Sequence, residues 1–362
     1  MSAPVLHVRG QVLVGPEEVR DELWVIGGKV SFSAPAGGGD VQSLEGWVLP
    51  GLVDAHCHVG LDKHGEVPRE VAEEQACTDR GTGTLLIRDA GQPGDTRWVD
   101  DREDLPKIIR AGRHIARTRR YIRNYAHEIE ESELVEHVRL EAHRGDGWVK
   151  LVGDWIDRDA GDLTPSWSRQ AVVDAIAAAH EEGVRVTAHC FGEESLRDLA
   201  AAGIDCVEHA TGLQGDSIDT FAAQGIAIVP TLVNIATFPS IAEPARAKFP
   251  RYADHMLDLH ARRYLTIGAA HEAGVPIYVG TDAGGSLPHG LVAQEMLELH
   301  RAGLSRVEAL SAGSWGAREW LGRPGISEGE DADLVVYGGD PREDLGVIGD
   351  PKAVILRGRI VH

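Results

Sequence analysis

Residues 181–189 read Glu-Glu-Gly-Val-Arg-Val-Thr-Ala-His, a phrase that decides the fold because variants of it recur along the chain. Further copies occupy residues 201–209, 223–231 and 272–282, and in each copy a glycine separates a helical segment from a run rich in Val and Ile. Glycine suits the left-handed position that closes a helix, and a Val/Ile run suits a strand buried on both faces. The phrase therefore predicts helices that alternate with buried parallel strands, each strand ending in a polar residue.

The same pattern continues upstream and brings the expected number of strands to eight. Four more strands are expected before residue 153, among them a short one over residues 110–115. Eight parallel strands with right-handed helical crossovers predict an α/β fold, a closed (β/α)8 barrel of the TIM type, with its active site at the C-terminal strand ends. The polar residues expected at those ends are His56, Asp89, Lys150, His189, His209, Thr231 and Asp282.

The two ends of the chain have a different character from its middle. Residues 5–48 and the residues from about 327 onward form short alternating strands with glycine turns and no intervening helices. We expect them to pair as a small β-sandwich domain, so that residues 1–49 and 327–362 form this domain and residues 50–326 form the barrel. Residues 37–40 are expected to form a turn. Residues 93–107 and 235–252, rich in proline and charge, are expected to form loops over the barrel mouth.

The charge balance limits the partners that the chain can have. With 36 Lys and Arg against 57 Asp and Glu, the 362 residues carry a net charge of −21, which argues against nucleic acid and anionic membranes. There is no apolar stretch near the roughly 20 residues of a membrane span, and the N-terminal residues lack a signal-peptide core. Four cysteines make no disulfide framework in a chain this long. We therefore expect a cytoplasmic protein that acts on a small molecule, with a homo-oligomer left open.

His56 and His58 stand one residue apart at the end of an apolar run. Residues i and i+2 of a strand point to the same side, so both imidazoles can reach one metal ion; the alternative is a pair of surface histidines. With the strand-end residues further on they make a set that suits zinc or a similar divalent ion. We expect one ion on His56, His58, His189 and Asp282, and a second site completed by Lys150 and His209.

Each later member of this set also has an interpretation without a metal. His189 and His209 could be buried histidines with satisfied hydrogen bonds, and Asp282 could cap a helix. Lys150 could pair with Asp154, because an ammonium repels a cation. To act as a ligand, Lys150 would have to react with carbon dioxide and form a carbamate, which needs a neutral amine, and burial lowers the pKa of a lysine from about 10.4.

These residues and their surroundings resemble the amidohydrolase superfamily over essentially the whole length. The matching motifs are Leu-Pro-Gly-Leu-Val-Asp-Ala-His-Cys-His, Val-Glu-His-Ala, Val-Pro-Thr-Leu, Gly-Thr-Asp-Ala-Gly and the closing Gly-Glu-Asp-Ala-Asp-Leu-Val-Val-Tyr. They are similar to the imidazolonepropionase-like and metal-dependent prolidase-like branch. The resemblance implies the barrel with its small β-domain, and metal ligands at His56, His58, Lys150, His189, His209 and Asp282. The chain departs from the branch after Lys150, where Leu-Val-Gly-Asp replaces a Ser-Gly-Gly-type turn.

The expected chemistry is hydrolysis of a C–N bond in an amide, dipeptide, N-acyl amino acid or cyclic amide. A metal at the barrel mouth provides hydroxide at neutral pH, and Asp282 would carry the proton from water to the leaving nitrogen. One alternative is a mononuclear deaminase acting on a cyclic amidine, which needs no carbamate; another is a non-catalytic binding relative, which would normally have lost ligands. His289, Arg88 and Trp155 are candidate substrate contacts.

Overall fold

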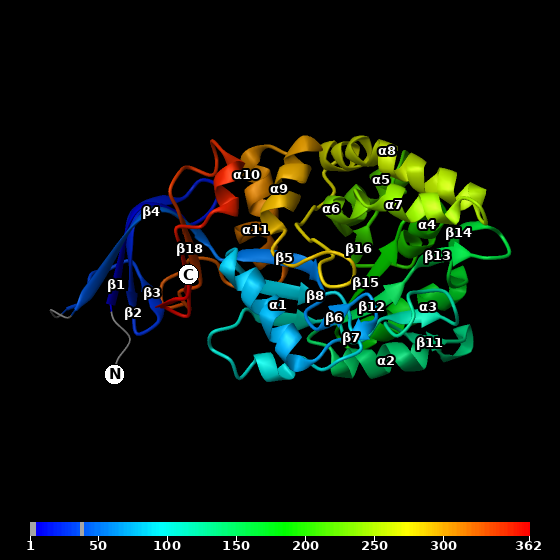
Figure 1. Cartoon of the computed structure of the whole chain (residues 1–362), viewed down its shortest axis with the longest axis horizontal. Coiled ribbons are helices and arrows are strands. Elements are labelled where there is room, and N and C mark those ends of the chain that lie inside the picture. The colour runs from blue at the N-terminus through cyan, green and yellow to red at the C-terminus, as the bar shows by residue number, and fades with distance from the viewer. Residues whose placement is uncertain (1–4, 37–39) are drawn as a thin grey trace.

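The computed structural model describes residues 5–36 and 40–362 (Figure 1). Most of the turn expected at residues 37–40, and the first four residues of the expected N-terminal part, lie outside this range. Figure 1 shows a sheet of terminal strands at one end of the molecule and a larger body of alternating strands and helices beside it. The chain is therefore α/β, as the repeated phrase predicts.

Strands from both ends of the chain share one seven-stranded sheet, in the order β20-β19-β18-β4-β1-β2-β3. The joining contact is between β4 and β18, which run antiparallel with Val48 opposite Val336. Alternate residues such as Leu6, Val8 and Val336 are fully buried. The pairing links the termini as expected, whereas a division of this sheet into the two layers of a sandwich stays a prediction. The strands are β1 (Val5–Leu13), β2 (Val19–Ile26), β3 (Lys29–Ser31), β4 (Val41–Pro50), β18 (Leu334–Tyr337), β19 (Ala353–Leu356) and β20 (Arg359–Ile360).

The body contains two groups of parallel strands. One has the order β5-β8-β9, and in the other β10, β12, β15, β16 and β17 follow one another, with β11 at the outer edge. All of their pairings are parallel. These strands are β5 (Leu52–Cys57), β8 (Thr84–Asp89), β9 (Lys107–Arg110), β10 (Ile115–Arg117), β11 (His127–Ile129), β12 (Trp148–Val152), β15 (Arg185–Cys190), β16 (Cys206–His209) and β17 (Ala227–Val229).

The strand expected over residues 110–115 is wrong in its position. Residues 111–114 interrupt it, between β9, which ends at Arg110 and pairs with β8, and β10, which begins at Ile115 and pairs with β12. Gly112 lies in the interruption with a φ of 72°, and a Cβ there would lie 2.3 Å from a carboxylate oxygen of Glu141. The glycine therefore bends one strand into two halves, which hold different neighbours.

The last parallel segment returns to the first strand of the body. Ile277 forms a parallel bridge with Ile228 of β17, and Ala283 forms one with Cys57. The amide of Ala55 in β5 also donates to the carbonyl of Val279 at 2.8 Å. The segment around residues 277–283 thus lies between β17 and β5, and brings Asp282 to the same edge as His56.

Helices follow the strands and cover them. The expected loop over residues 235–252 is wrong, because α7 forms there: its proline at the first turn needs no amide partner, and Phe238 and Ala242 are buried. No described helix has the length and apolar character that a membrane crossing requires. The helices are α1 (Arg69–Gly81), α2 (Leu134–Arg144), α3 (Arg169–Glu181), α4 (Glu193–Ala201), α5 (Asp216–Gln224), α6 (Leu232–Ile235), α7 (Phe238–Ala245), α8 (Pro250–Glu272), α9 (Val292–Arg301), α10 (Arg306–Ala312) and α11 (Trp315–Trp320).

Two short hairpins stand beyond the C-terminal ends of the strands. The first consists of β6 (Leu61–Asp62) and β7 (Gly65–Glu66), which follow His58 directly. The second consists of β13 (Asp154–Asp157) and β14 (Asp162–Pro165), which follow Lys150 and β12. Both hairpins therefore grow out of strands that carry candidate ligands, and they border the site described next.

Candidate active site

His56, His58 and Asp282 form a tight cluster of potential ligand atoms. The Nε2 atoms of His56 and His58 lie 3.2 Å apart, and Oδ1 of Asp282 lies 3.1 Å from the first and 3.0 Å from the second. His58 is oriented by Nδ1, which lies 2.7 Å from the carbonyl of Gly91. Three atoms of the two ligand types that zinc takes therefore converge on one point.

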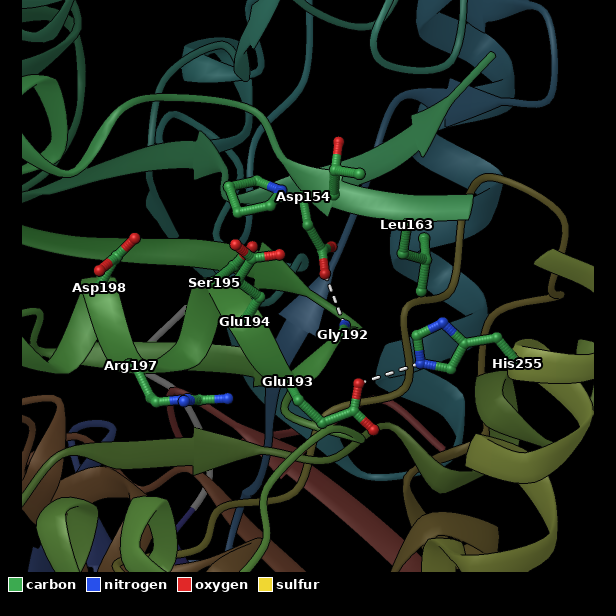
Figure 2. Close-up of a pocket in the computed structure, with 11 residues that line it drawn as sticks. Asp154, Leu163, Gly192, Glu193, Glu194, Ser195, Arg197, Asp198 and His255 are labelled. Atoms are coloured by element: carbon green, nitrogen blue, oxygen red, sulfur yellow. Dashed lines mark hydrogen bonds and ion pairs between the residues drawn. The ribbon is translucent and has the colours of Figure 1, made fainter. Parts of the chain in front are cut away.

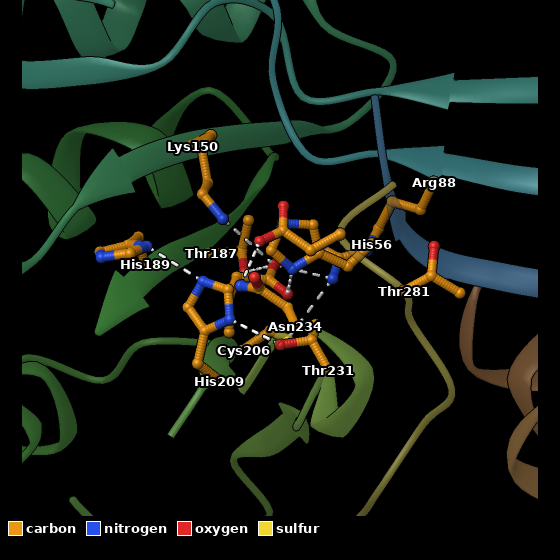
Figure 3. Close-up of polar contacts among 12 residues, drawn as sticks. His56, Arg88, Lys150, Thr187, His189, Cys206, His209, Thr231, Asn234 and Thr281 are labelled. Carbon is orange, nitrogen blue, oxygen red and sulfur yellow. Dashed lines mark hydrogen bonds and ion pairs between the residues drawn. The ribbon is translucent and has the colours of Figure 1, made fainter. Parts of the chain in front are cut away.

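His189 and His209 form a second pair on neighbouring strands. Nδ1 of His189 lies 3.0 Å from Nε2 of His209, and Nδ1 of His209 lies 2.7 Å from Oγ1 of Thr231 (Figure 3). The expected grouping had assigned His189 to the ion held by His56 and His58. The geometry instead groups His189 with His209, because β15 and β16 are adjacent while β5 lies elsewhere in the strand order.

Three site residues adopt the left-handed backbone conformation that side chains other than glycine rarely take. The φ angles are 66° for His209, 51° for Thr231 and 58° for Asp282. Each of them lies at the C-terminal end of a strand or parallel segment. Such strained residues persist where the surrounding structure fixes them, and they gather at functional sites. The strain thus marks the same edge of the body that the ligand atoms mark.

Lys150 is fully buried at the middle of β12, and its amine has no hydrogen-bond partner among the described residues. Its nearest ion-pair atom is Oε1 of Glu208, at 3.7 Å. Burial lowers the pKa of Lys150 from its ordinary value, although Glu208 opposes this change. The alternative pairing with Asp154 does not form, because the carboxylate of Asp154 accepts hydrogen bonds from the amides of Phe191 and Gly192.

Glu208 is a functional residue that the sequence reasoning missed. Its carboxylate lies 2.9 Å from Nδ1 of His56 and 2.8 Å from Nη2 of Arg88, and it also accepts from Oγ1 of Thr187. Burial would raise the pKa of Glu208, but the charges of Arg88, Lys150 and His56 outweigh it and hold that pKa well below its usual range. The contact with His56 is an ion-pair contact by distance, without hydrogen-bond geometry, and it places a buried negative charge beside the far nitrogen of a candidate ligand.

The reason why Glu208 was missed is the backbone at His209. Strict alternation along β16 puts Glu208 and His209 on opposite faces, and His209 was the recognised ligand. The left-handed φ of His209 breaks that alternation, so both side chains reach the site. The only signal in the sequence was the phrase Val-Glu-His itself, whose acid precedes the ligand.

Of the three candidate substrate contacts, only Trp155 borders the cavity beside the ligands. Arg88 is fully buried and bound to Glu208 beneath the site. His289 lies behind β5, where Nδ1 contacts Asp79 at 2.8 Å and Cys57 at 3.6 Å. Cys57 alternates away from His56 and His58, so residues that contact Cys57 face away from the ligands. Arg88 is therefore closed to solvent, His289 faces away from the ligands, and neither borders this cavity.

The cavity beside the ligands has a volume of about 200 Å³. One end is polar and includes His58, His189, Asn234 and Asp282. The remainder is formed mainly by aromatic and aliphatic side chains from the β13–β14 hairpin, the loop before β11, α7 and α8, and the β6–β7 turn contributes Lys63. The arrangement places a small apolar chamber directly against the candidate ligands.

The donor set fits a divalent metal. Among the described residues, Nζ of Lys150 is buried without a hydrogen-bond partner, and Nδ1 of His189 and Nε2 of His209 converge at 3.0 Å on the neighbouring strands. Buried polar atoms are normally paired, so an orphaned amine and a pair of facing imidazole nitrogens indicate a missing partner. A cation would satisfy the facing nitrogens of His189 and His209, and a carbamate on Lys150 would supply an acceptor for a cation.

Comparison with known proteins identifies the family. Residues 47–361 match the model described as the Amidohydrolase family. An uncharacterized protein of Mycobacterium tuberculosis is 54% identical over 355 residues, which are 98% of this chain and 95% of that protein. Ochratoxinase of Aspergillus niger is 27% identical over 234 residues, which are 61% of this chain and 47% of that protein.

Solved structures share the fold. The structure of a Xaa-Pro dipeptidase with methionine bound in its active site superposes with a TM-score of 0.82 at 22% identity, covering 99% of this chain and 100% of that one. These neighbours have the TIM-barrel type of fold. The expected branch is also confirmed, since prolidases are among the structural neighbours and an imidazolonepropionase, 27% identical, is among the relatives. The chain belongs to the amidohydrolase family and is a hydrolase that acts on carbon–nitrogen bonds.

Proposed function

We propose that this chain is a metal-dependent hydrolase of an amide bond in a dipeptide, an N-acyl amino acid or a cyclic amide. The observation that carries the proposal is the convergence of His56, His58 and Asp282, whose ligand atoms lie 3.0–3.2 Å from one another next to a cavity of about 200 Å³. The similarity to a Xaa-Pro dipeptidase supports an amide of an amino acid as the substrate.

Two groups of residues would hold the metal. His56, His58 and Asp282 form one group, and His189 with His209 forms the other. Zinc or another divalent ion bound there would polarise the substrate carbonyl and provide hydroxide at neutral pH. In this proposal the neutral amine of Lys150 would form an N–C bond with carbon dioxide and lose one proton, and the carbamate would supply carboxylate-type ligands for the metal.

Asp282 is the group that we propose to move the proton. Nδ2 of Asn234 donates to Oδ2 of Asp282 at 2.7 Å, which leaves Oδ1 directed at His56 and His58. Burial would raise the pKa of Asp282, but the two histidines outweigh burial and hold it well below its ordinary value. Asp282 is therefore a carboxylate at neutral pH, able to accept a proton from water and to pass it to the leaving nitrogen.

We also propose the architecture that positions this site. We infer that residues 50–326 form the closed (β/α)8 barrel, and that residues 1–49 and 327–362 form the small β-domain. The return of residues 277–283 to β5 supports closure. The hydrolase needs that closure because His56 and Asp282 come from segments more than 220 residues apart in the sequence.

The test begins with elemental analysis of the purified protein and continues with N-acyl amino acids, dipeptides and cyclic amides. One or two equivalents of a divalent ion, and release of a free amino acid, are the expected results. Release of ammonia from a cyclic amidine with one ion bound would replace the proposal by the deaminase. Absence of a bound divalent ion after expression in metal-supplemented medium would overturn it.

Lys150→Ala tests the carbamate separately. We expect loss of most activity and of part of the bound metal, because the bridge between the two ligand groups is removed. A short carboxylic acid should partly restore both by occupying the place of the carbamate. A wild-type protein whose metal content and activity do not respond to removal and return of bicarbonate would show that Lys150 acts as a plain amine.

A further inference from the structure

We propose that the substrate of this site carries a bulky apolar group, aromatic or branched, together with a carboxylate that pairs with Lys63. This inference rests on the proposed function and narrows it to one substrate class. It follows from two separate features of the cavity: the composition of its wall and the charge at its rim.

The wall is built from rings that contact one another around His189. Tyr121 and Trp155 have ring centroids 4.9 Å apart in an edge-to-face arrangement, and each lies about as close to the ring of His189, at 5.5 and 5.3 Å. Phe191 lies 4.3 Å from the same imidazole. These aromatic faces therefore reach the ligands themselves, so an apolar group of the substrate would lie close to the scissile bond.

Aliphatic side chains complete the wall on the side away from the rings. Met256 of α8 is buried behind it, and Ile241 of α7 is 43% exposed although it borders the cavity. An exposed isoleucine at the edge of an aromatic chamber leaves apolar surface for a ligand to cover. A small dipeptide of polar residues would leave this surface in water, whereas a phenyl or branched side chain would bury it.

Lys63 is the one cation among the described residues that border this cavity. It lies in the turn between β6 and β7, and no carboxylate of the described residues forms an ion pair with it. Hydrogen bonds hold the turn on both sides: the hydroxyl of Tyr125 donates to the carbonyl of Asp62 at 2.7 Å, and Nδ2 of Asn124 donates to the carbonyl of His64 at 3.1 Å.

Lys63 brings a positive charge to the cavity although the chain as a whole carries a net charge of −21. Asp282 borders the same cavity and would repel a substrate carboxylate. The two charges therefore orient the substrate: its carboxylate lies toward Lys63 and its amide toward Asp282. The apolar group then lies along the rings between them.

The experiment measures binding, so that it does not depend on hydrolysis. Isothermal calorimetry of the metal-loaded protein compares 3-phenylpropanoate with propanoate, which lacks the ring, and with 3-phenylpropanamide, which lacks the charge. We expect 3-phenylpropanoate to bind at least about tenfold more tightly than either of the other two probes, because burial of a phenyl ring and pairing of a carboxylate each contribute a factor of this order. Equal affinity for 3-phenylpropanoate and propanoate would overturn the apolar part.

Lys63→Met tests whether the lysine at the cavity rim binds the carboxylate. Lys352→Met is the matched control, because this substitution removes the same charge beside the terminal sheet. We expect Lys63→Met to lower the affinity for 3-phenylpropanoate severalfold and to leave 3-phenylpropanamide unchanged, with no change in either for Lys352→Met. Ile241→Asn should weaken both phenyl probes, and Ile360→Asn neither. An unchanged preference for the carboxylate in Lys63→Met would overturn the role of Lys63. Failure of the hydrolysis assays alone would overturn the proposed function and not this binding preference.

Discussion

Two hollows bordered by the β13–β14 hairpin differ in the contacts that their charged groups make. The larger, with a volume of about 410 Å³, lies between β14, the start of α4 and α8 (Figure 2). The smaller, of about 200 Å³, adjoins the candidate ligands. In the larger cleft, His255 bridges Asp162 and Glu193 at 2.9 and 3.0 Å. Near the smaller cavity, Nζ of Lys150 is buried with no hydrogen-bond partner among the described residues.

The cleft also has one buried polar atom without a hydrogen-bond partner among the described residues, but it is the hydroxyl of Ser195 and carries no charge. The comparison teaches that buried ionisable groups without a partner, more than volume, indicate where a ligand belongs. α8 borders both hollows, giving Met256 to the cavity and His255 to the cleft. Asp154 illustrates the difference, because it lines the cleft but its carboxylate already accepts hydrogen bonds from the amides of Phe191 and Gly192. We therefore expect substitutions in the cavity to alter function, and substitutions in the cleft to alter stability.

The largest effect is expected for the double variant His56→Ala with His58→Ala. It removes two of the three converging ligand atoms, so bound metal and activity should both fall to background. Elemental analysis and the hydrolysis assay measure the two losses, and His143→Ala on the exposed face of α2 is the control. Full metal content in the double variant would show that the ion binds elsewhere.

Asp282→Asn should have the next largest effect. The amide keeps an oxygen near the histidines but cannot accept the proton, and general acid–base catalysis typically contributes about 10²–10⁴-fold. We expect turnover to fall by about that factor while metal content falls less. Near-normal turnover would assign the proton transfer to another group.

Glu208→Gln tests the residue that the sequence reasoning missed. Glutamine keeps the shape but removes the charge that orients His56 at 2.9 Å and is paired with Arg88. Loss of an outer partner of a ligating histidine typically costs about 10–100-fold in metal affinity or activity. Metal affinity from chelator competition is the readout, and a change in the pH profile of activity would separate this role from a loss of folding. Unchanged affinity would mean that His56 is oriented without Glu208.

The contrast between the hollows also explains what could be predicted from the sequence. The α/β fold, the pairing of the termini and the candidate ligands depend on periodicity and on residue types at strand ends, which are local features. His56, His58 and Asp282 converge because their segments are neighbours in the strand order. The residues near His56 do not indicate that the segment of Asp282 lies beside them, but the expected pattern of eight strands predicts it.

The features that could not be predicted depend on exceptions to local rules. The bend at Gly112 and the left-handed backbone of His209 each change the direction of the residues around them. The inward position of Glu208 follows from the second of these exceptions, whereas the grouping of His189 with His209 follows from the pairing of β15 with β16. α7 formed where proline and charge had suggested a loop, because Phe238 and Ala242 bury an apolar side that tertiary packing supplies.

The smallest functional effect, and the sharpest test of the comparison, is expected for His255→Gln in the cleft. Its hydrogen bond with Glu193 is the main cause that raises the pKa of His255 to about 9; burial opposes this change and Asp162 reinforces it. Other charges of α8 face the same acids: Arg262 contacts Glu193, and Arg251 lies 3.7 Å from Asp162. His255 is thus a cation at neutral pH that joins α8 to α4 and β14.

Because the folded-state pKa lies above the unfolded value of about 6.5, the stabilisation by His255 is complete below pH 6.5 and is lost as the pH rises through about 9. Denaturant unfolding should show that His255→Gln lowers the free energy of unfolding by about 1–3 kcal/mol at pH 6 and by much less at pH 10. Turnover at pH 7 should change little, since the cleft contributes no candidate ligand. A pH-independent loss of stability would mean that His255 is neutral in the folded protein. A hundredfold loss of turnover with metal content and stability intact would make the paired cleft part of the active site, and would break the distinction between the two hollows.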